Sequence, residues 1–178
     1  MSMEHKAFVF DHDAFDRELR PTLERALSSH DISGLVAFIN ANSGQLFDPY
    51  EGEPLGEGWE VMIETPDAHQ YGDFALTKYY DPTVDIGLGV LWERVQELIS
   101  NDPTLVESPI LGTVVGPGDA PFDPGKMGAY FQSAEQVRRH YHSLMGFQQL
   151  FPNDDNLKKA IQMLAQAKNA ERGLYVTF

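Results

Sequence analysis

The stretch NDDNLKKAIQMLAQAKNAERGLYVTF, residues 153–178, carries the clearest structural pattern of the chain. Pro152 and the polar residues 153–155 are typical of a helix start. Apolar side chains then recur at helical spacing, at Leu157, Ala160, Ile161 and Leu164. Gly173 is expected to end the helix, and the alternating segment Leu174–Phe178 is predicted to be a closing strand.

Upstream of this stretch, local signals predict further helices. Ser133 and Gln136 have the spacing of a capping box, so a helix is predicted to open at Ser133. Asp11 or Asp13 is predicted to cap an earlier helix, which Pro21 either kinks or restarts. Three more helices are predicted at residues 33–41, 73–80 and 88–99.

Short segments rich in strand formers lie between these helices. The first is Lys6–Phe10, and Trp59–Ile63 alternates apolar and polar side chains as a half-buried strand does. Ile110–Val115 reads as a strand that leads into a loop rich in Gly and Pro, and Met127–Phe131 is predicted to be extended.

The order of the elements indicates the fold class. Helices and strands follow one another without regular alternation, which favours an α+β fold over a doubly wound sheet. We predict a single globular domain over residues 1–178, with about six helices and a small sheet of four or five short, mixed strands. A chain of 178 residues with 42% hydrophobic residues is long enough to bury such a core.

Composition excludes several classes of protein. The chain has no cysteine, so disulfides, thiolate chemistry and cysteine-ligated metals are excluded. Glu4 and His5 interrupt the N-terminal segment before a long apolar region can form, so no secretory signal is expected. No segment approaches the roughly 18–20 apolar residues that span a bilayer. The expected location is the cytoplasm.

The acidic charge is unevenly distributed along the chain. The net charge is −14; residues 1–125 carry 23 acidic and six basic side chains, whereas residues 126–178 carry four acidic and seven basic ones. No lysine or arginine occurs between Arg25 and Lys78, a stretch that contains nine carboxylates. This charge disfavours nucleic-acid and anionic-membrane binding, because both need basic surface.

The same acidic stretch suggests a binding surface, although solvated acidic loops are also common. Carboxylates next to aromatic side chains are typical of a face that attracts a basic protein. The leading hypothesis is a non-enzymatic binding protein, with an immunity-like role as one form of it. The candidate partner-binding residues are Asp48, Glu51, Glu53, Glu57, Trp59, Glu60, Glu64 and Asp67.

A search for catalytic and cofactor motifs finds none. The sequence lacks the nucleophile elbow G-x-S-x-G, the phosphate loop G-x-x-x-x-G-K-[ST] and the zinc motif H-E-x-x-H. His140 and His142 are two residues apart on a predicted helix and so point about 200° away from each other, which excludes chelation of one ion. They are interpreted as cations near the helix C-terminus. No catalytic residue, cofactor or metal is predicted.

Two alternative hypotheses remain. Asp11, His12 and Asp13 follow the first predicted strand and could form a small-ligand or hydrolase-type site, although helix capping explains them as well. The chain could also be a structural subunit of a homo-oligomer. Light scattering would test that hypothesis.

The second half of the chain resembles a known family. SPILGTVV, a Gly-Pro loop, GAYFQSAEQV, FPNDDNL and AERGLYVTF follow one another in the order found in the YfbM-like family. The helix that bears Trp92 is similar to a segment that precedes this block. The resemblance covers about residues 85–178 and implies a small bacterial protein of α+β fold. It implies no reaction and no site residues.

Overall fold

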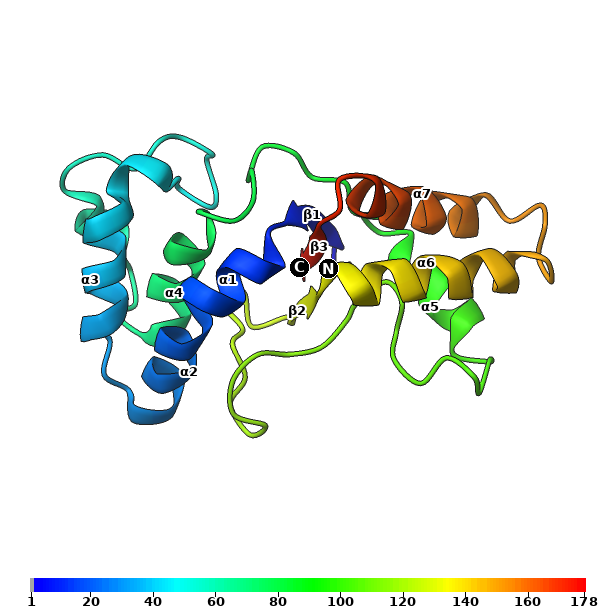
Figure 1. The fold of residues 1–178 in the computed structure, drawn as a ribbon, viewed down its shortest axis with the longest axis horizontal. Coiled ribbons are helices and arrows are strands. Elements are labelled where there is room, and N and C mark those ends of the chain that lie inside the picture. Colours follow the sequence, from blue (N-terminus) through cyan, green and yellow to red (C-terminus); the bar gives the residue numbers. More distant parts are fainter. Residues whose placement is uncertain (1) are drawn as a thin grey trace. The chain divides into compact units, whose positions relative to one another are not determined.

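The computed structural model describes residues 2–178, which fold into two compact units (Figure 1). The first unit takes in the chain up to His12, Asp85–Thr113 and Ala129–Phe178, and the second takes in Asp13–Val84 and Val114–Gly128. Within the described residues there are seven α-helices and three strands, so the α+β class is confirmed. The single domain predicted for residues 1–178 remains a prediction.

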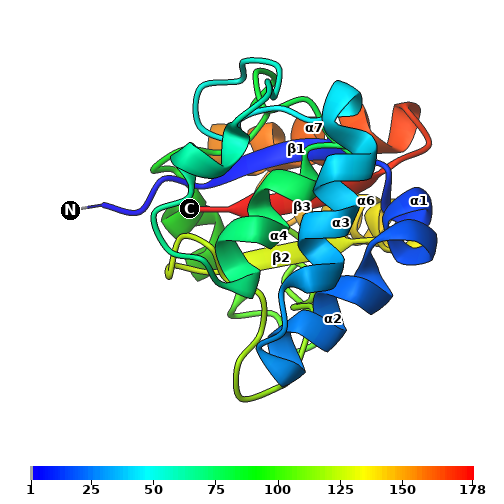
Figure 2. The ribbon, with the colours of Figure 1, turned by 90° about the vertical axis from the view of Figure 1, so that its left-hand side faces the viewer.

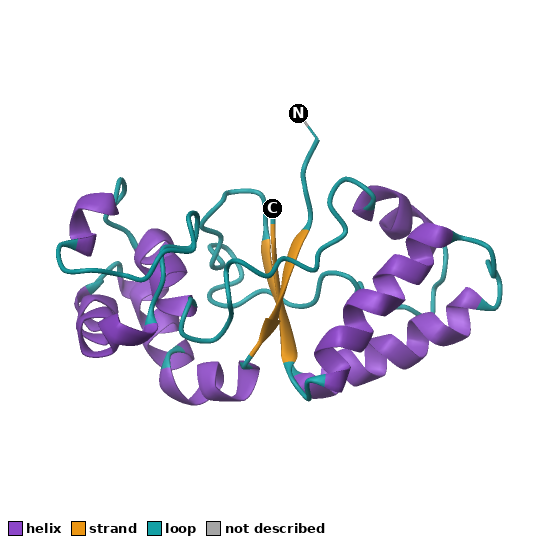
Figure 3. Ribbon diagram, turned by 90° about the horizontal axis from the view of Figure 1, so that it is seen from above, coloured by secondary structure: helices purple, strands orange, loops and turns teal. Residues whose placement is uncertain are grey.

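The first unit contains a three-stranded sheet, drawn in orange in Figure 3. The strands are β1 (Lys6–Phe10), β2 (Ala129–Gln132) and β3 (Gly173–Thr177). The C-terminal strand β3 is central and pairs antiparallel with both neighbours. The sheet therefore has fewer strands than predicted, and it is antiparallel rather than mixed.

Successive side chains of each strand point to opposite sides of the sheet, so the sheet has two different faces. Ala7, Leu174 and Val176 belong to the apolar core that includes the helices of this unit. On the opposite face Phe8, Phe10, Phe131 and Tyr175 pack ring against ring, with centroids 5.0–6.2 Å apart. Both faces are thus apolar, which explains why the strand segments read as nearly continuous hydrophobic runs.

Three helices complete the first unit: α5 (Trp92–Ile99), α6 (Ala134–Gln148) and α7 (Asp155–Asn169). The predicted capping box is confirmed, because Ser133 and Gln136 each accept a backbone hydrogen bond from the other. Asp154 caps α7 by accepting from the Leu157 N–H. Helices α6 and α7 run side by side (Figure 1) and bury their apolar faces in the core.

A fully buried histidine, His5, joins the start of β1 to two distant loops. Its Nε2 donates to the Ile110 carbonyl at 2.7 Å, and its Nδ1 accepts from the Leu88 N–H at 3.2 Å. The neutral ring therefore makes a hydrogen bond with each of its nitrogens. Burial favours this neutral form and lowers the pKa of His5 below 6.5. The histidine therefore has a structural role.

We expect His5→Phe to lower the free energy of unfolding by about 2–5 kcal/mol, because the substitution leaves two buried backbone groups without partners. A folded pKa below 6.5 means that this stabilisation is present above pH 6.5 and is lost as the pH falls. The difference in the free energy of unfolding between wild type and variant, measured by urea unfolding, should therefore become smaller at low pH. The same substitution at exposed His142 should change little.

The second unit is helical. It is built from α1 (His12–Glu18), whose first residue belongs to the first unit, α2 (Arg20–Ser29), α3 (Ser33–Asn42) and α4 (Ala68–Leu76). Helices α2, α3 and α4 pack against one another (Figure 2). Pro21 lies in the first turn of α2, so the predicted restart is confirmed.

Three predicted elements are wrong or displaced. Trp59–Ile63 is no strand: Gly58, with φ 77°, begins the short 3-10 helix η2 (Trp59–Met62). Ile110–Val115 makes only one bridge, Thr113 to Phe131, because Gly112 takes a φ of 118° against the Phe131 carbonyl. The helix predicted at residues 73–80 is α4, which begins at Ala68 after the Asp67 cap.

No helix among residues 2–178 combines the length and the apolar character needed to cross a bilayer.

Candidate functional site

The predicted partner-binding residues lie in the second unit, and five of them are exposed. These are Glu51, Glu53, Glu57, Glu60 and Glu64. Among the described residues, no lysine or arginine forms an ion pair with any of the five. Together with the exposed side chains of Tyr50 and Val61, we call these glutamates the acidic surface.

Hydrogen bonds fix the loop that presents part of this surface. Phe47 and Pro54 form an isolated bridge, and the Asp48 N–H donates to the Glu53 carbonyl at 2.9 Å. The Asp48 carboxylate accepts from the backbone N–H groups of Tyr50 and Glu51. Asp48 thus organises the turn, as aspartate often does, and Asp67 caps α4.

Trp59 corrects the expectation of an exposed aromatic anchor. Its side chain is only 5% exposed, its indole N–H donates to Asn40 at 3.2 Å, and its ring meets Tyr71 edge to face. The turn of η2 directs Trp59 inward and leaves the next apolar side chain, Val61, 90% exposed. Tyr50 is 67% exposed. The sequence shows both residues beside glutamates, but only the backbone conformation shows that they are exposed.

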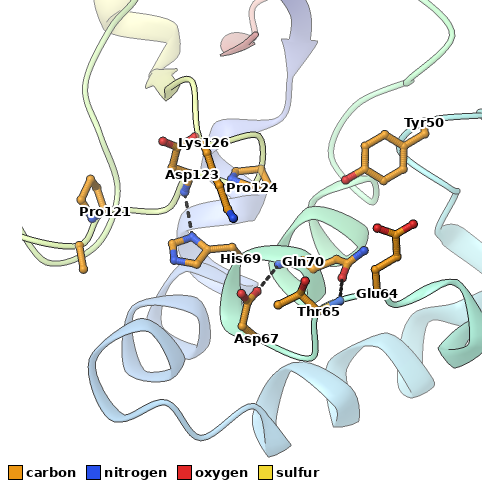
Figure 4. Close-up of a pocket in the computed structure, with 11 residues that line it drawn as sticks. Tyr50, Glu64, Thr65, Asp67, His69, Gln70, Pro121, Asp123, Pro124 and Lys126 are labelled. Carbon is orange, nitrogen blue, oxygen red and sulfur yellow. Dashed lines mark hydrogen bonds between the residues drawn. The ribbon is translucent and has the colours of Figure 1, made fainter.

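A cavity of about 400 Å³ lies next to the acidic surface (Figure 4). Tyr50 and Glu64 stand on one side of it, and His69, Asp123 and Lys126 on the other. The residues from 120 to 126 come from a loop more than 40 positions after the end of α4 in the sequence. The prediction identified Glu64 and Asp67 of this cavity and missed the rest.

The polar side chains of the cavity are held by bonds to the backbone. Asp67 accepts from the Gln70 N–H at 2.9 Å, and the Gln70 side-chain oxygen accepts from the Thr65 N–H at 2.6 Å. The Asp123 N–H donates to His69 Nδ1 at 3.0 Å, which leaves the proton of the neutral ring on Nε2. Each of these side chains is thus fixed at one atom by a backbone N–H group.

The carboxylates outnumber the cations in this cavity. Glu64, Asp67 and Asp123 carry negative charge, and Lys126 is the cation among the lining residues. His69 is engaged as a hydrogen-bond acceptor at Nδ1 and stacks on Phe122. A cationic group is therefore the favoured occupant on electrostatic grounds.

A buried carboxyl group lies behind Tyr50. Asp73 on α4 is 6% exposed, and burial raises its pKa from 3.8 to about 7, although a hydrogen bond from Tyr50 opposes the shift. The pKa of Tyr50 is raised to about 12 by its own desolvation and by the charge of Asp73. Burial thus favours the protonated form of Asp73 far above the pH at which an exposed carboxyl group ionises.

Asp11, His12 and Asp13 have three different environments. Asp11 pairs with Arg172 at 3.1 Å, His12 is buried with its ring edge to face with Phe10, and Asp13 is exposed. The hypothesis of a ligand site at these residues remains a prediction.

No group of three or more His, Asp or Glu side chains in the described part of the chain is placed to hold a metal ion. Comparisons with protein-family models, with curated protein sequences and with solved structures find no match for this chain.

Proposed function

We propose that the protein is a cytoplasmic, non-enzymatic binding protein whose acidic surface engages a basic protein partner. The observation that carries the proposal is the exposure of five glutamates without a lysine or arginine partner among the described residues, in the same segment as the exposed side chains of Tyr50 and Val61. An immunity-like role, in which a small acidic protein neutralises a basic one, is the biological form that this chemistry suggests.

Charge and apolar contact have different tasks in such a surface. The glutamates attract a basic partner over a distance of about a Debye length and accelerate its association. Val61 and Tyr50 supply the apolar contact that slows dissociation, because well-packed anchors carry most of the binding energy of an interface. Asp48 and Asp67 support the surface through the turn and the helix cap.

The cavity beside Glu64 adds a place for one side chain of the partner. Its volume of about 400 Å³ and its excess of carboxylates suit a lysine or arginine. The ring of Tyr50 at its edge can contact the aliphatic stem or the cation of that side chain.

Charge reversal tests the proposal. A partner captured from cell extract would be purified, and its affinity measured by calorimetry at low and high salt. We expect the triple variant Glu51→Lys, Glu53→Lys, Glu57→Lys to weaken binding at least about tenfold, with most of the loss in the association rate. Raising the salt concentration should weaken wild-type binding in the same direction.

A matched control makes the same change of charge elsewhere. Glu4→Lys, Glu93→Lys and Glu97→Lys alter three exposed glutamates of the first unit. This variant should keep most of the wild-type affinity. Equal losses in both triple variants would indicate a general effect of net charge, and binding that ignores both salt and the first variant would refute the proposal.

A further inference from the structure

A second cavity, of about 330 Å³, lies in the first unit and is separate from the acidic surface in sequence and composition. The segment from Thr104 to Glu107 and the helix α6 line it, and its polar side chains include Glu107, Arg139, His140 and Ser143. His140 is only 4% exposed and lies in the middle of α6. The interpretation of His140 as a cation at the helix C-terminus is therefore wrong.

The buried side chain of Gln132 fixes the tautomer of His140. The amide nitrogen of Gln132 donates to the carbonyls of Pro109 and Leu111, at 2.9 and 3.4 Å. Its amide oxygen must therefore face His140, whose Nδ1 lies 2.8 Å away. Because that oxygen only accepts hydrogen bonds, His140 carries its proton on Nδ1. The lone pair of the neutral ring is then on Nε2.

This tautomer leaves two acceptors facing each other. His140 Nε2 lies 3.4 Å from the Glu107 carboxylate, and neither atom has a proton to share while the ring is neutral. Burial, together with the charge of Arg139, lowers the pKa of His140 and keeps the ring neutral, although Glu107 opposes this effect. A hydrogen-bond donor from outside the chain, a water molecule or a ligand, can bridge the two acceptors.

The charges around the pair restrict the kind of donor. Arg139 contacts the same Glu107 oxygen at 3.3 Å, so the site has one positive and one negative group and no net charge. An ammonium ion would be attracted by Glu107 but repelled by Arg139, and a carboxylate would be attracted by Arg139 but repelled by Glu107, so neither charge is favoured overall. A hydroxyl group avoids both penalties, because it donates to one neighbour and accepts from another.

We propose that this cavity binds a small uncharged compound with adjacent hydroxyl groups, such as a monosaccharide or another polyol. One hydroxyl donates to Glu107. Its neighbour donates to His140 Nε2 and accepts from the Arg139 guanidinium. Neighbouring hydroxyls of a polyol are spaced comparably to the 3.4 Å between the two acceptor atoms, and the cavity has room for a single sugar ring. The site differs from the acidic surface in location and in charge, so either proposal can fail alone.

Side-chain ¹⁵N spectra of the histidines, recorded while the full-length protein is titrated, test the proposal. The probes are D-glucose, D-ribose and glycerol as neutral polyols, sodium lactate as an anion and ethylammonium chloride as a cation. We expect the free protein to show the Nδ1-protonated form of His140. At least one polyol should shift the His140 Nε2 signal and the Ser143 amide in a saturable way below about 100 mM.

Variants at the cavity separate a site from a general effect of the solute. Arg139→Gln and Glu107→Gln should weaken polyol binding at least about fivefold, and Arg138→Gln, exposed one position earlier on α6, should not change it. Far-UV circular dichroism confirms that each variant folds. Preference for lactate or ethylammonium, or the absence of a saturable shift with every polyol, would overturn the proposal.

Discussion

Gly173→Ala is expected to destabilise the fold strongly, because the added methyl group falls where two strands approach each other closely. Gly173 opens the central strand β3, and a Cβ atom there would overlap the carbonyl oxygen of Gln132 in the neighbouring strand. It would also lie 2.9 Å from the His12 Cβ atom. The backbone oxygen cannot move without breaking the pairing of β2 with β3, so we expect a loss of about 3–5 kcal/mol or more.

Urea unfolding monitored by circular dichroism measures this effect, and Gly146→Ala is its control. Gly146 lies within α6, and beyond its own stretch of helix no atom of the described residues comes within 4 Å of the position of its Cβ. The added methyl group should therefore stabilise the helix by about 0.5–1 kcal/mol. If Gly173→Ala unfolded at the wild-type midpoint, the close approach of the two strands would be incorrect.

Local chemistry made parts of this fold predictable. The bounds of β1 followed from its strand formers, the start of α6 from its capping box, and the start of α2 from Pro21. Each of these signals acts between residues that are neighbours in the sequence. The segment Trp59–Ile63 has an equally good pattern, but no other segment within residues 2–178 pairs with it as a strand. Alternation alone therefore predicted the wrong structure.

In the candidate site, too, local features could be predicted from the sequence and features that depend on distant segments could not. The sequence identifies the acidic stretch, and the structure places five of its glutamates on the surface. The loop of Asp123 and Lys126 reaches the cavity through contacts between distant parts of the chain, which no local pattern reports. The pair of Glu107 and His140 likewise depends on a non-local contact. The resemblance of residues 85–178 to the YfbM-like family stays a prediction.

Asp73→Asn is expected to make the protein more stable at alkaline pH. The native pKa of Asp73, about 7, lies above the usual 3.8, so the native state binds this proton more tightly than the unfolded chain does. The stabilisation is complete below pH 3.8 and is lost as the pH rises from 3.8 to about 7. At about 1.4 kcal/mol for each pKa unit, the loss is on the order of 4 kcal/mol at most.

The asparagine variant is neutral at every pH and so avoids this loss. Near pH 4 wild type and variant should have similar free energies of unfolding, and at pH 8 the variant should be more stable by about 1–3 kcal/mol. Urea unfolding of both proteins across this range gives the difference directly. Because titrating groups such as His5 are present in both proteins, their contributions cancel in the comparison.

Asp119→Asn provides the control for the loss of one negative charge, since Asp119 is exposed on a loop of the same unit. The difference in the free energy of unfolding between Asp119→Asn and wild type should be nearly independent of pH. If Asp73→Asn were instead less stable than wild type at pH 8, the ionised carboxylate would have to gain more from the Tyr50 hydroxyl than its burial costs. The buried pair would then stabilise the turn that presents the acidic surface, and removing the Tyr50 hydroxyl with Tyr50→Phe should abolish that gain.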